Sequence, residues 1–199
     1  YIFKQKMIGR EFEKFWNNYF NQTIPLNYLF KEVYHERWLR IHSLPQSKRY
    51  PDNDLEMNII LQRQNQIISD IYNENEEIYL VMANIIHKKE KHELINFYPN
   101  LNFERSYSIE LEKHFSNNFN NDEILDVFVC EKKWNLNSYD EILKDIANDI
   151  SRVFFISLNN KIIVSPYDGG IDIIFNSETD KNILREKYKE WISNRIDEL

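Results

Sequence analysis

The sequence predicts an α+β fold, with a single domain over residues 1–199 that packs helices on a mainly antiparallel sheet. Residues 152–175 contain three β-rich runs separated by turn residues, which indicates adjacent antiparallel strands. Elsewhere strand and helix patterns are mixed, without the regular alternation that builds a parallel sheet. The chain has no internal repeat and no linker, and its 199 residues, 42% of them hydrophobic, suit one sizeable core.

The three strands are expected at residues 153–158, 161–164 and 171–175. Asn159 and Asn160 separate the first two, and asparagine tolerates the positive φ angles of a two-residue hairpin turn. The sequence therefore predicts a C-terminal hairpin followed by a third strand.

The second turn, at residues 167–170, contains two of the three glycines in the chain, Gly169 and Gly170. These glycines are expected to supply positive φ, with Asp168 capping backbone donors. A closing helix is predicted at about residues 179–196. Its apolar stripe consists of Ile183, Leu184, Tyr188, Trp191 and Ile192.

An amphipathic helix is predicted at about residues 8–22, because large aromatic side chains recur there at helical spacing. These side chains are Phe12, Phe15, Trp16, Tyr19 and Phe20. The stripe is expected to be a packing face, since aromatic stripes bury a large apolar area. An exposed binding groove is the alternative.

Residues 36–44 alternate apolar and polar side chains, as a strand does. One face carries Leu39 and Ile41, and the other carries Trp38, Arg40 and His42. A loop with two prolines follows at residues 44–51.

Two further helices are predicted from the capping boxes Asn53-x-x-Glu56 and Ser138-x-x-Glu141. The apolar side of the first is expected to contain Leu55, Ile59, Ile60, Ile67, Ile68 and Ile71, and that of the second Leu143, Ile146, Ala147 and Ile150. Apolar runs predict strands at residues 78–83 and 124–134. A short strand is expected at residues 94–98 and a loop at residues 117–121.

Composition and charge narrow the class of protein. The net charge of -7 disfavours nucleic-acid binding, because an acidic surface repels phosphate groups. No apolar run approaches the length of a membrane helix, and the first residues do not resemble a signal peptide. Cys130 is the only cysteine and is expected to be a buried apolar residue. The sequence therefore predicts a cytoplasmic protein.

The first candidate site is the basic segment at residues 37–51, which contains no acidic residue. Its candidate ligand-binding side chains are Arg40, His42, Ser43, Ser47, Lys48 and Arg49. Arginine forks and hydroxyl groups bind phosphate or carboxylate, and a histidine can act as a general acid or base. The alternative is that these side chains tie the loop to acidic neighbours.

The second candidate site is the glycine turn with Tyr167, Asp168 and Asp172. Paired carboxylates can bind a cation, but the alternating acids of an EF-hand are absent, which favours a structural role. His87 and His92 are five residues apart and would face different sides of a helix, so no metal site is predicted. With three glycines in the chain, no nucleotide loop or other cofactor is expected.

Two motifs carry a resemblance to a known family. They are R-I-H-S-L-P-Q-S-K-R-Y-P at residues 40–51 and P-Y-D-G-G-I-D-I-I-F at residues 166–175, and K-Y-K-E-W-I-S at residues 187–193 is also similar. The chain resembles the bacterial family called domain of unknown function 3885, from about residue 37 to residue 199. This resemblance implies one intact bacterial domain, and it implies no activity and no site residues.

The functional hypothesis drawn from the sequence is a non-catalytic protein-binding module, of the kind that an immunity protein or antitoxin represents. An acidic chain without a cofactor motif suits a basic toxin as its partner, because opposite charges speed association. Asp168, Asp172 and the acids of residues 73–77 would be the contacts. The alternative is an enzyme or binding protein for a small phosphorylated or carboxylated ligand, which predicts that the two motifs converge in one pocket.

Overall fold

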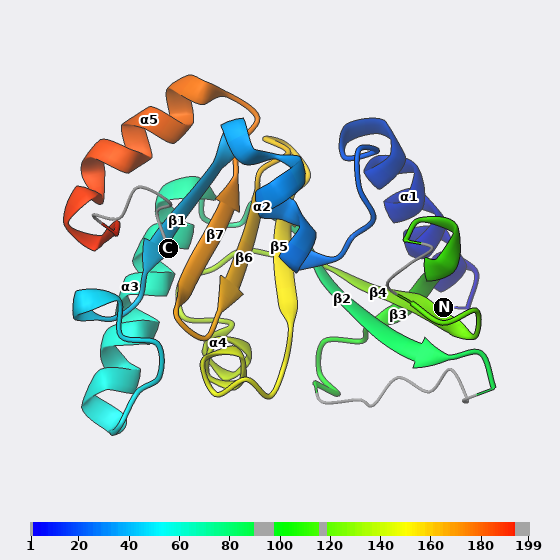
Figure 1. Cartoon of the computed structure of the whole chain (residues 1–199), viewed down its shortest axis with the longest axis horizontal. Helices are drawn as coiled ribbons and strands as arrows, with labels where there is room; N and C mark the ends of the chain where they lie inside the picture. Colours follow the sequence, from blue (N-terminus) through cyan, green and yellow to red (C-terminus); the bar gives the residue numbers. More distant parts are fainter. Residues whose placement is uncertain (1, 90–97, 116–118, 194–199) are drawn as a thin grey trace. The chain divides into compact units, whose positions relative to one another are not determined.

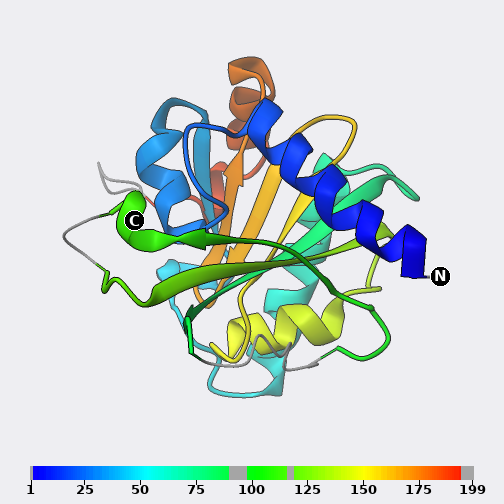
Figure 2. The same ribbon diagram turned by 90° about the vertical axis from the view of Figure 1, so that its right-hand side faces the viewer.

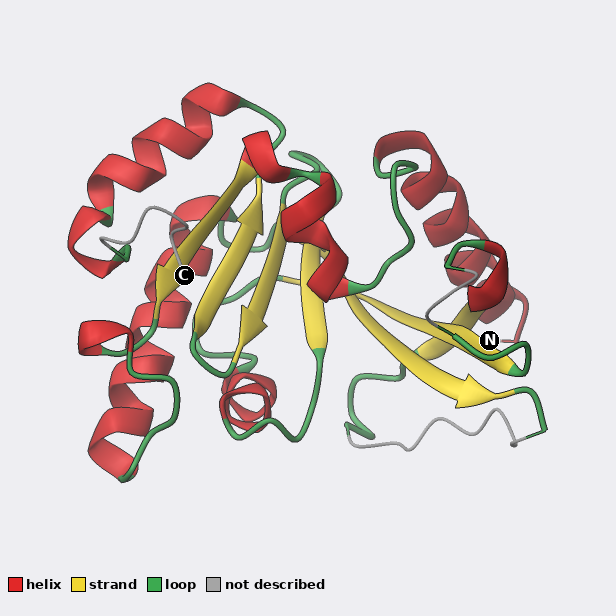
Figure 3. Ribbon diagram, in the orientation of Figure 1, coloured by secondary structure: helices red, strands yellow, loops and turns green. Residues whose placement is uncertain are grey.

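The computed structural model describes residues 2–89, 98–115 and 119–193, and it divides into two compact units. Unit 1 comprises residues 1–26 and 80–131, and unit 2 comprises residues 27–79 and 132–199. In both units the strands whose register is defined pair antiparallel, and helices pack on them (Figures 1 and 3). The predicted α+β class with a mainly antiparallel sheet is confirmed.

Unit 1 is built from one long helix and three strands. These are α1 (Ile2–Tyr19), β2 (Glu77–His87), β3 (Glu104–Glu110) and β4 (Glu123–Lys133), with a short 3-10 turn, η4 (Leu111–Lys113). The strands hydrogen-bond in the order β2-β4-β3. The strands predicted at residues 78–83 and 124–134 are therefore confirmed.

Helix α1 packs on β3 (Figure 2), and its aromatic side chains make the contact. Phe12 is fully buried and stacks with Tyr107 of β3 at a centroid distance of 6.3 Å. Gly9 permits the close approach, because a Cβ atom at this position would lie 2.8 Å from the Cα of Ser106. Trp16 is buried as well, so the prediction of a packing face is confirmed for most of the stripe, although Tyr19 is 50% exposed.

Unit 2 contains four strands, the first residues of β2, and several helices. The α-helices are α2 (Phe30–Val33), α3 (Asp54–Ile71), α4 (Asp140–Ala147) and α5 (Glu178–Lys187), and the 3-10 helices are η1 (Asn27–Leu29), η2 (His35–Arg37), η3 (Pro45–Ser47) and η5 (Lys189–Trp191). The strands are β1 (Trp38–His42), β5 (Val153–Ser157), β6 (Ile163–Tyr167) and β7 (Gly170–Ile174). They lie side by side in the order β1-β7-β6-β5 (Figure 1).

The three predicted C-terminal strands are present and adjacent, but the first turn differs from the prediction. Asn159 and Asn160 do not adopt positive φ, and Lys161 does, with φ of 55°. The Ser157 N–H donates to the Ile162 carbonyl at 3.1 Å and closes a four-residue loop in place of the expected two-residue turn. The prediction was wrong because β5 ends one residue before the end of its β-rich run, and β6 begins two residues after the start of its run.

The glycine turn also differs, because no glycine of the chain has positive φ. Gly170 already belongs to β7 and lies opposite His42 of β1. A Cβ atom at Gly170 would lie 2.2 Å from the carbonyl oxygen of Ile41, a distance that real Cβ atoms do not show. The backbone approach of β1 therefore requires Gly170, and the prediction of a conformational role was wrong.

The register across β1, β7 and β6 arranges side chains in rows. Arg40 lies opposite Asp172, which lies opposite Ser165, so these three side chains project from one face of the sheet. Leu39 and Ile41 project from the other face and are fully buried. The strand predicted at residues 36–44 is confirmed for residues 38–42 with the predicted alternation, whereas residues 36 and 37 belong to η2.

Helix α3 begins as predicted, because the Asn53 side chain accepts a hydrogen bond from the Glu56 N–H at 3.1 Å. Its apolar side was predicted incorrectly at the first turns, where Leu55 is 75% and Ile59 is 36% exposed. Gln64 and Asn65 are buried instead, because their side-chain amides donate hydrogen bonds to Ser43 and Asp140.

The predicted capping box of α4 does not form. Tyr139 is the N-cap residue and no side chain caps this helix, so Ser138 lies one residue too early. Ile150 was expected on the apolar side and is 57% exposed, since α4 ends at Ala147.

Helix α5 ends earlier than predicted, and the short 3-10 helix η5 follows it. Leu184 and Tyr188 are buried as expected, whereas Ile183 is 64% exposed. Residues 194–196 of the predicted helix lie outside the described residues. The same holds for most of the strand predicted at residues 94–98, for part of the loop at residues 117–121, and for His92.

Two further predictions concern the burial of Cys130 and the presence of a membrane-spanning helix. Cys130 is buried at 3% exposure, as predicted. None of the helices in the described part of the chain is long and apolar enough to span a membrane.

Candidate functional site

The two predicted motifs meet in unit 2 through a bidentate ion pair. The Arg40 Nε lies 2.7 Å from Asp172 Oδ1, and Nη2 lies 2.8 Å from Oδ2. The side chains are only 18% and 15% exposed. Burial acts to lower the pKa of Arg40, but the hydrogen bond and charge of Asp172 outweigh it and raise the pKa. The guanidinium therefore stays charged.

Aromatic rings support the same guanidinium from two sides. The Arg40 Cζ lies 4.4 Å from the ring centroid of Tyr167 and 5.4 Å from that of Trp38, both within cation-π range. Burial raises the pKa of the Tyr167 phenol well above its usual range, so the ring faces the arginine as a neutral group. Arg40 is thus held at a fixed position on the sheet.

A second ion pair joins the basic segment to the glycine turn. The Arg49 Nε donates to Asp168 Oδ2 at 2.6 Å. Asp168 is 5% exposed, whereas the Arg49 side chain is 64% exposed. Asp168 thus accepts from an arginine, and the backbone-capping role predicted for it is replaced by this pair.

The two arginines line a cavity of about 710 Å³, which we call the arginine cavity. Its walls are formed by Arg40, His42, Gln46, Ser47, Arg49, Tyr167, Gly169 and Ser193. No carboxylate of the described residues lines it, because Asp168 and Asp172 lie on the other side of their arginines. The cavity therefore has two cationic groups in its wall and no opposing charge.

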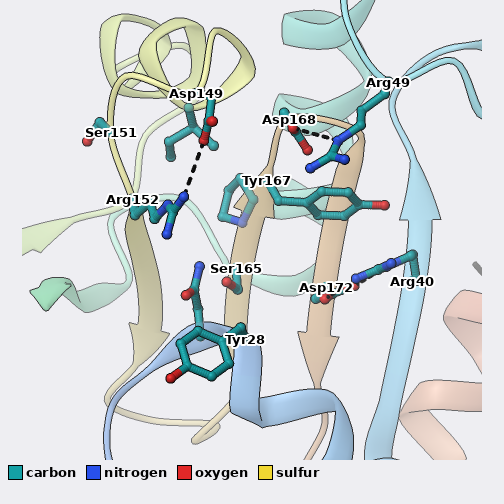
Figure 4. A pocket seen from close by; sticks show the side chains of 13 residues that line it. Tyr28, Arg40, Arg49, Asp149, Ser151, Arg152, Ser165, Tyr167, Asp168 and Asp172 are labelled. Carbon is teal, nitrogen blue, oxygen red and sulfur yellow. Dashed lines mark hydrogen bonds and ion pairs between the residues drawn. The ribbon is translucent and has the colours of Figure 1, made fainter. Parts of the chain in front are cut away.

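The two aspartates line a separate pocket of about 250 Å³, the sheet pocket, shown in Figure 4. Pro166 lies in its wall, beyond the point where β5 and β6 pair at Phe155↔Val164. A third pair, Arg152 and Asp149 at 3.6 Å, lines the opposite rim. Three arginines and three aspartates thus surround this pocket, and their charges balance.

His42 is part of the wall of the arginine cavity and is 5% exposed. Within residues 2–89, 98–115 and 119–193, neither ring nitrogen has a hydrogen-bond partner of good geometry, and both nitrogens are closed to solvent. Burial, and then the charge of Arg40, lowers the pKa of the imidazole, so the ring is neutral at pH 7. A buried donor and acceptor without partners carry a free-energy cost of about 1–3 kcal/mol.

The turn beside the cavity holds two consecutive residues in the left-handed region. Gln46 has φ of 57° and Ser47 has φ of 56°. Residues other than glycine, asparagine and aspartate adopt this conformation at a cost of about 1–3 kcal/mol each. Both residues line the arginine cavity.

The remaining predicted site residues are engaged elsewhere. Ser43 Oγ accepts from the Gln64 amide at 2.9 Å, and Lys48 binds Asp52 and Glu56 at 2.7 Å. Ser43 and Lys48 line neither cavity. For Lys48, the alternative interpretation of a cation tied to acidic neighbours describes the geometry.

The sequence did not single out several residues of these cavities. Gln46 lay inside the first motif but was passed over as an ordinary loop residue, and Arg152 began the strand-rich segment. Ser193 carried no signal, because it approaches the cavity only through the fold. No described set of three or more His, Cys, Asp and Glu side chains is arranged to hold a metal ion.

Comparison with known families assigns the chain to a class. The family model described as Domain of unknown function (DUF3885) matches residues 26–195, so the chain belongs to this family, as its motifs predicted. The match includes both motifs and every residue that lines the two cavities. Comparison with curated proteins and with solved structures gives no match.

Proposed function

We propose that the protein binds a small anionic molecule in the arginine cavity. One observation carries this proposal: among the described residues, two guanidinium groups and no carboxylate line a large cavity in a protein whose net charge is -7. Cations on an acidic protein are expected to face acids on all sides. Here each arginine has its aspartate on one side and the cavity on the other.

The hydrogen bonds of the two arginines leave donors for a ligand. Arg40 uses Nε and Nη2 on Asp172, and Arg49 uses Nε on Asp168. Within the part of the chain that the structure describes, Nη1 of Arg40 and both terminal nitrogens of Arg49 have no hydrogen-bond partner. Charge-assisted hydrogen bonds of this kind contribute about 1.5–3 kcal/mol each. Because the aspartates already fix the arginines, a ligand need not order them, which supports tight binding.

The proposal is tested by calorimetric titration and thermal melting with inorganic phosphate and with sulfate. We expect both anions to raise the melting temperature, since a ligand of the native state stabilises it. Arg49→Gln should weaken phosphate binding about tenfold or more. Arg152→Gln is the matched control, because Arg152 is 70% exposed and also paired with an aspartate, but lines only the sheet pocket.

Two results would refute the proposal. The first is the absence of any shift with either anion at millimolar concentration. The second is an equal loss of affinity in Arg49→Gln and in Arg152→Gln, which would mean that phosphate responds only to total charge.

A protein partner, such as a basic toxin bound by an immunity protein or antitoxin, is the second candidate. Leu55 and Ile59 support it, because they are exposed on successive turns of α3, close in sequence to Asp52 and Asp54. Asp168 and Glu76 cannot contribute contacts, since both are buried.

The test of this candidate is purification from the native host followed by size-exclusion chromatography. We expect a stoichiometric complex that is lost in the Leu55→Ser variant, which should leave the fold intact because Leu55 is 75% exposed. A monomer in both samples would contradict it.

A further inference from the structure

We infer that the ligand of the arginine cavity is a phosphate monoester of a polar, hydroxyl-bearing organic group, such as a sugar phosphate. This inference rests on the proposed function and names the chemical class of the ligand. Three observations support it: the size of the cavity, the chemistry of its neutral wall, and the strained turn that supplies part of that wall.

The cavity is much larger than an inorganic anion. Its volume of about 710 Å³ lies within the range of about 300–1,000 Å³ that is typical of sites for organic molecules and cofactors. A phosphate ion held by Arg40 and Arg49 would fill only a small part of it. Most of the ligand must therefore be something other than the anionic group.

The neutral wall of the cavity carries polar side chains next to the Tyr167 ring. Gln46 contributes an amide, Ser47 and Ser193 contribute hydroxyl groups, and no aliphatic side chain appears among the lining residues. An acyl chain placed there would bury the Gln46 amide and the Ser47 hydroxyl without partners, which is unfavourable. A hydroxyl-bearing group can exchange hydrogen bonds with both.

The two arginines favour a phosphoryl group over a carboxylate. Arg40 projects from β1 and Arg49 from the loop after η3, so their guanidinium groups approach from different elements (Figure 4). A carboxylate is planar and can be satisfied by one guanidinium fork. A phosphate monoester presents three terminal oxygens in different directions and can accept from both arginines.

The turn at Gln46 and Ser47 indicates that these side chains are kept for a purpose other than folding. Glycine adopts φ near 57° without steric strain, so glycine would relieve the turn at either position. Both side chains instead line the cavity. Strained residues of this kind cluster at ligand-binding sites.

The experiment compares ligands by isothermal titration calorimetry on the full chain. The ligands are inorganic phosphate, ribose 5-phosphate, glucose 6-phosphate, unphosphorylated ribose and hexanoate. We expect at least one sugar phosphate to bind about tenfold or more tighter than inorganic phosphate, and ribose and hexanoate not to bind. Equal affinity for inorganic phosphate and both sugar phosphates, or binding of hexanoate, would overturn the inference while leaving anion binding intact. Failure of every anion would instead refute the proposed function.

Variants test the role of the turn. Gln46→Gly with Ser47→Gly should keep or raise the melting temperature, weaken sugar-phosphate binding about tenfold and leave inorganic phosphate unchanged. Lys161→Gly is the matched control, because Lys161 has φ of 55° but lies on the β5–β6 loop, so it should change stability alone. Gln46→Asn, which also tolerates this φ, repeats the test if the double variant does not fold. Unchanged sugar-phosphate affinity in the folded variants would overturn the inference.

Discussion

Replacing Asp172 with asparagine tests how strongly the Arg40–Asp172 pair holds the sheet together. The pair joins β1 to β7 through two hydrogen bonds of 2.7 and 2.8 Å, and both side chains are more than four-fifths buried. Asparagine has the same shape as aspartate. Its carbonyl oxygen still accepts one hydrogen bond from Arg40. Its NH2 group, however, takes the place of the second carboxylate oxygen, so two donors face each other there.

The expected loss follows from that geometry. Removing one partner of a fully buried pair costs about 3–5 kcal/mol, and losing a hydrogen bond to a charged group costs about 1.5–3 kcal/mol. Because this pair is partly exposed and asparagine keeps one bond, we expect Asp172→Asn to lower the free energy of unfolding by about 2–3 kcal/mol. For a chain of this size that corresponds to a fall in Tm of about 5–10 °C.

The assay is urea denaturation monitored by tryptophan fluorescence, carried out as a double-mutant cycle with Arg40→Met. The cycle removes the contribution of the Tyr167 and Trp38 rings, which contact Arg40 in both backgrounds. A coupling free energy of about 1.5 kcal/mol or more is expected. A coupling below about 0.5 kcal/mol would refute the reasoning, because it is typical of an exposed pair.

Three further predictions concern other parts of unit 2. Gly170→Ala should destabilise the fold by about 3 kcal/mol or more, measured by urea denaturation, because its Cβ would overlap the Ile41 carbonyl; a loss below about 1 kcal/mol would contradict this. The pKa of His42 is lowered from 6.5, so the unfolded chain binds a proton that the folded chain resists, and stability should fall as pH drops below about 6.5. In His42→Asn, the urea midpoint should change less between pH 7.5 and pH 5.5 than it does in the wild type. An unchanged pH dependence would show that other groups cause the loss of stability. Asn53→Ala should cost about 1 kcal/mol and Ser138→Ala almost nothing, and equal losses would mean that Ser138 caps α4 after all.

The strands were predictable because their signal is local. Alternation in residues 36–44 identified the face that carries Arg40, and β-rich runs identified β6 and β7. The pairing of β1 with β7 joins residues 132 positions apart, and no local pattern contains that information. The ion pair that unites the two motifs therefore could not be derived from periodicity.

The errors on the helices have a related cause. Helix α3 has apolar residues on more than one side, so periodicity alone could not choose which side is buried. Gln64 is buried because Ser43 accepts its hydrogen bond, and Asn65 is buried because Asp140 accepts another. These partners come from other elements. The burial of Gln64 and Asn65 could not be predicted, because their partners are not visible from the sequence.

The same long separation between β1 and β7 has a consequence for the order of folding. The arginine cavity takes Arg40 and Arg49 from the early part of the chain and Tyr167 and Ser193 from the late part. Closing so long a loop is slow, and contacts of high sequence separation form after local ones. During synthesis Arg40 and Arg49 remain without Asp172 and Asp168 until β7 has left the ribosome. If a ligand binds in this cavity as proposed, it would therefore stabilise only the finished fold and would not guide the growing chain toward it.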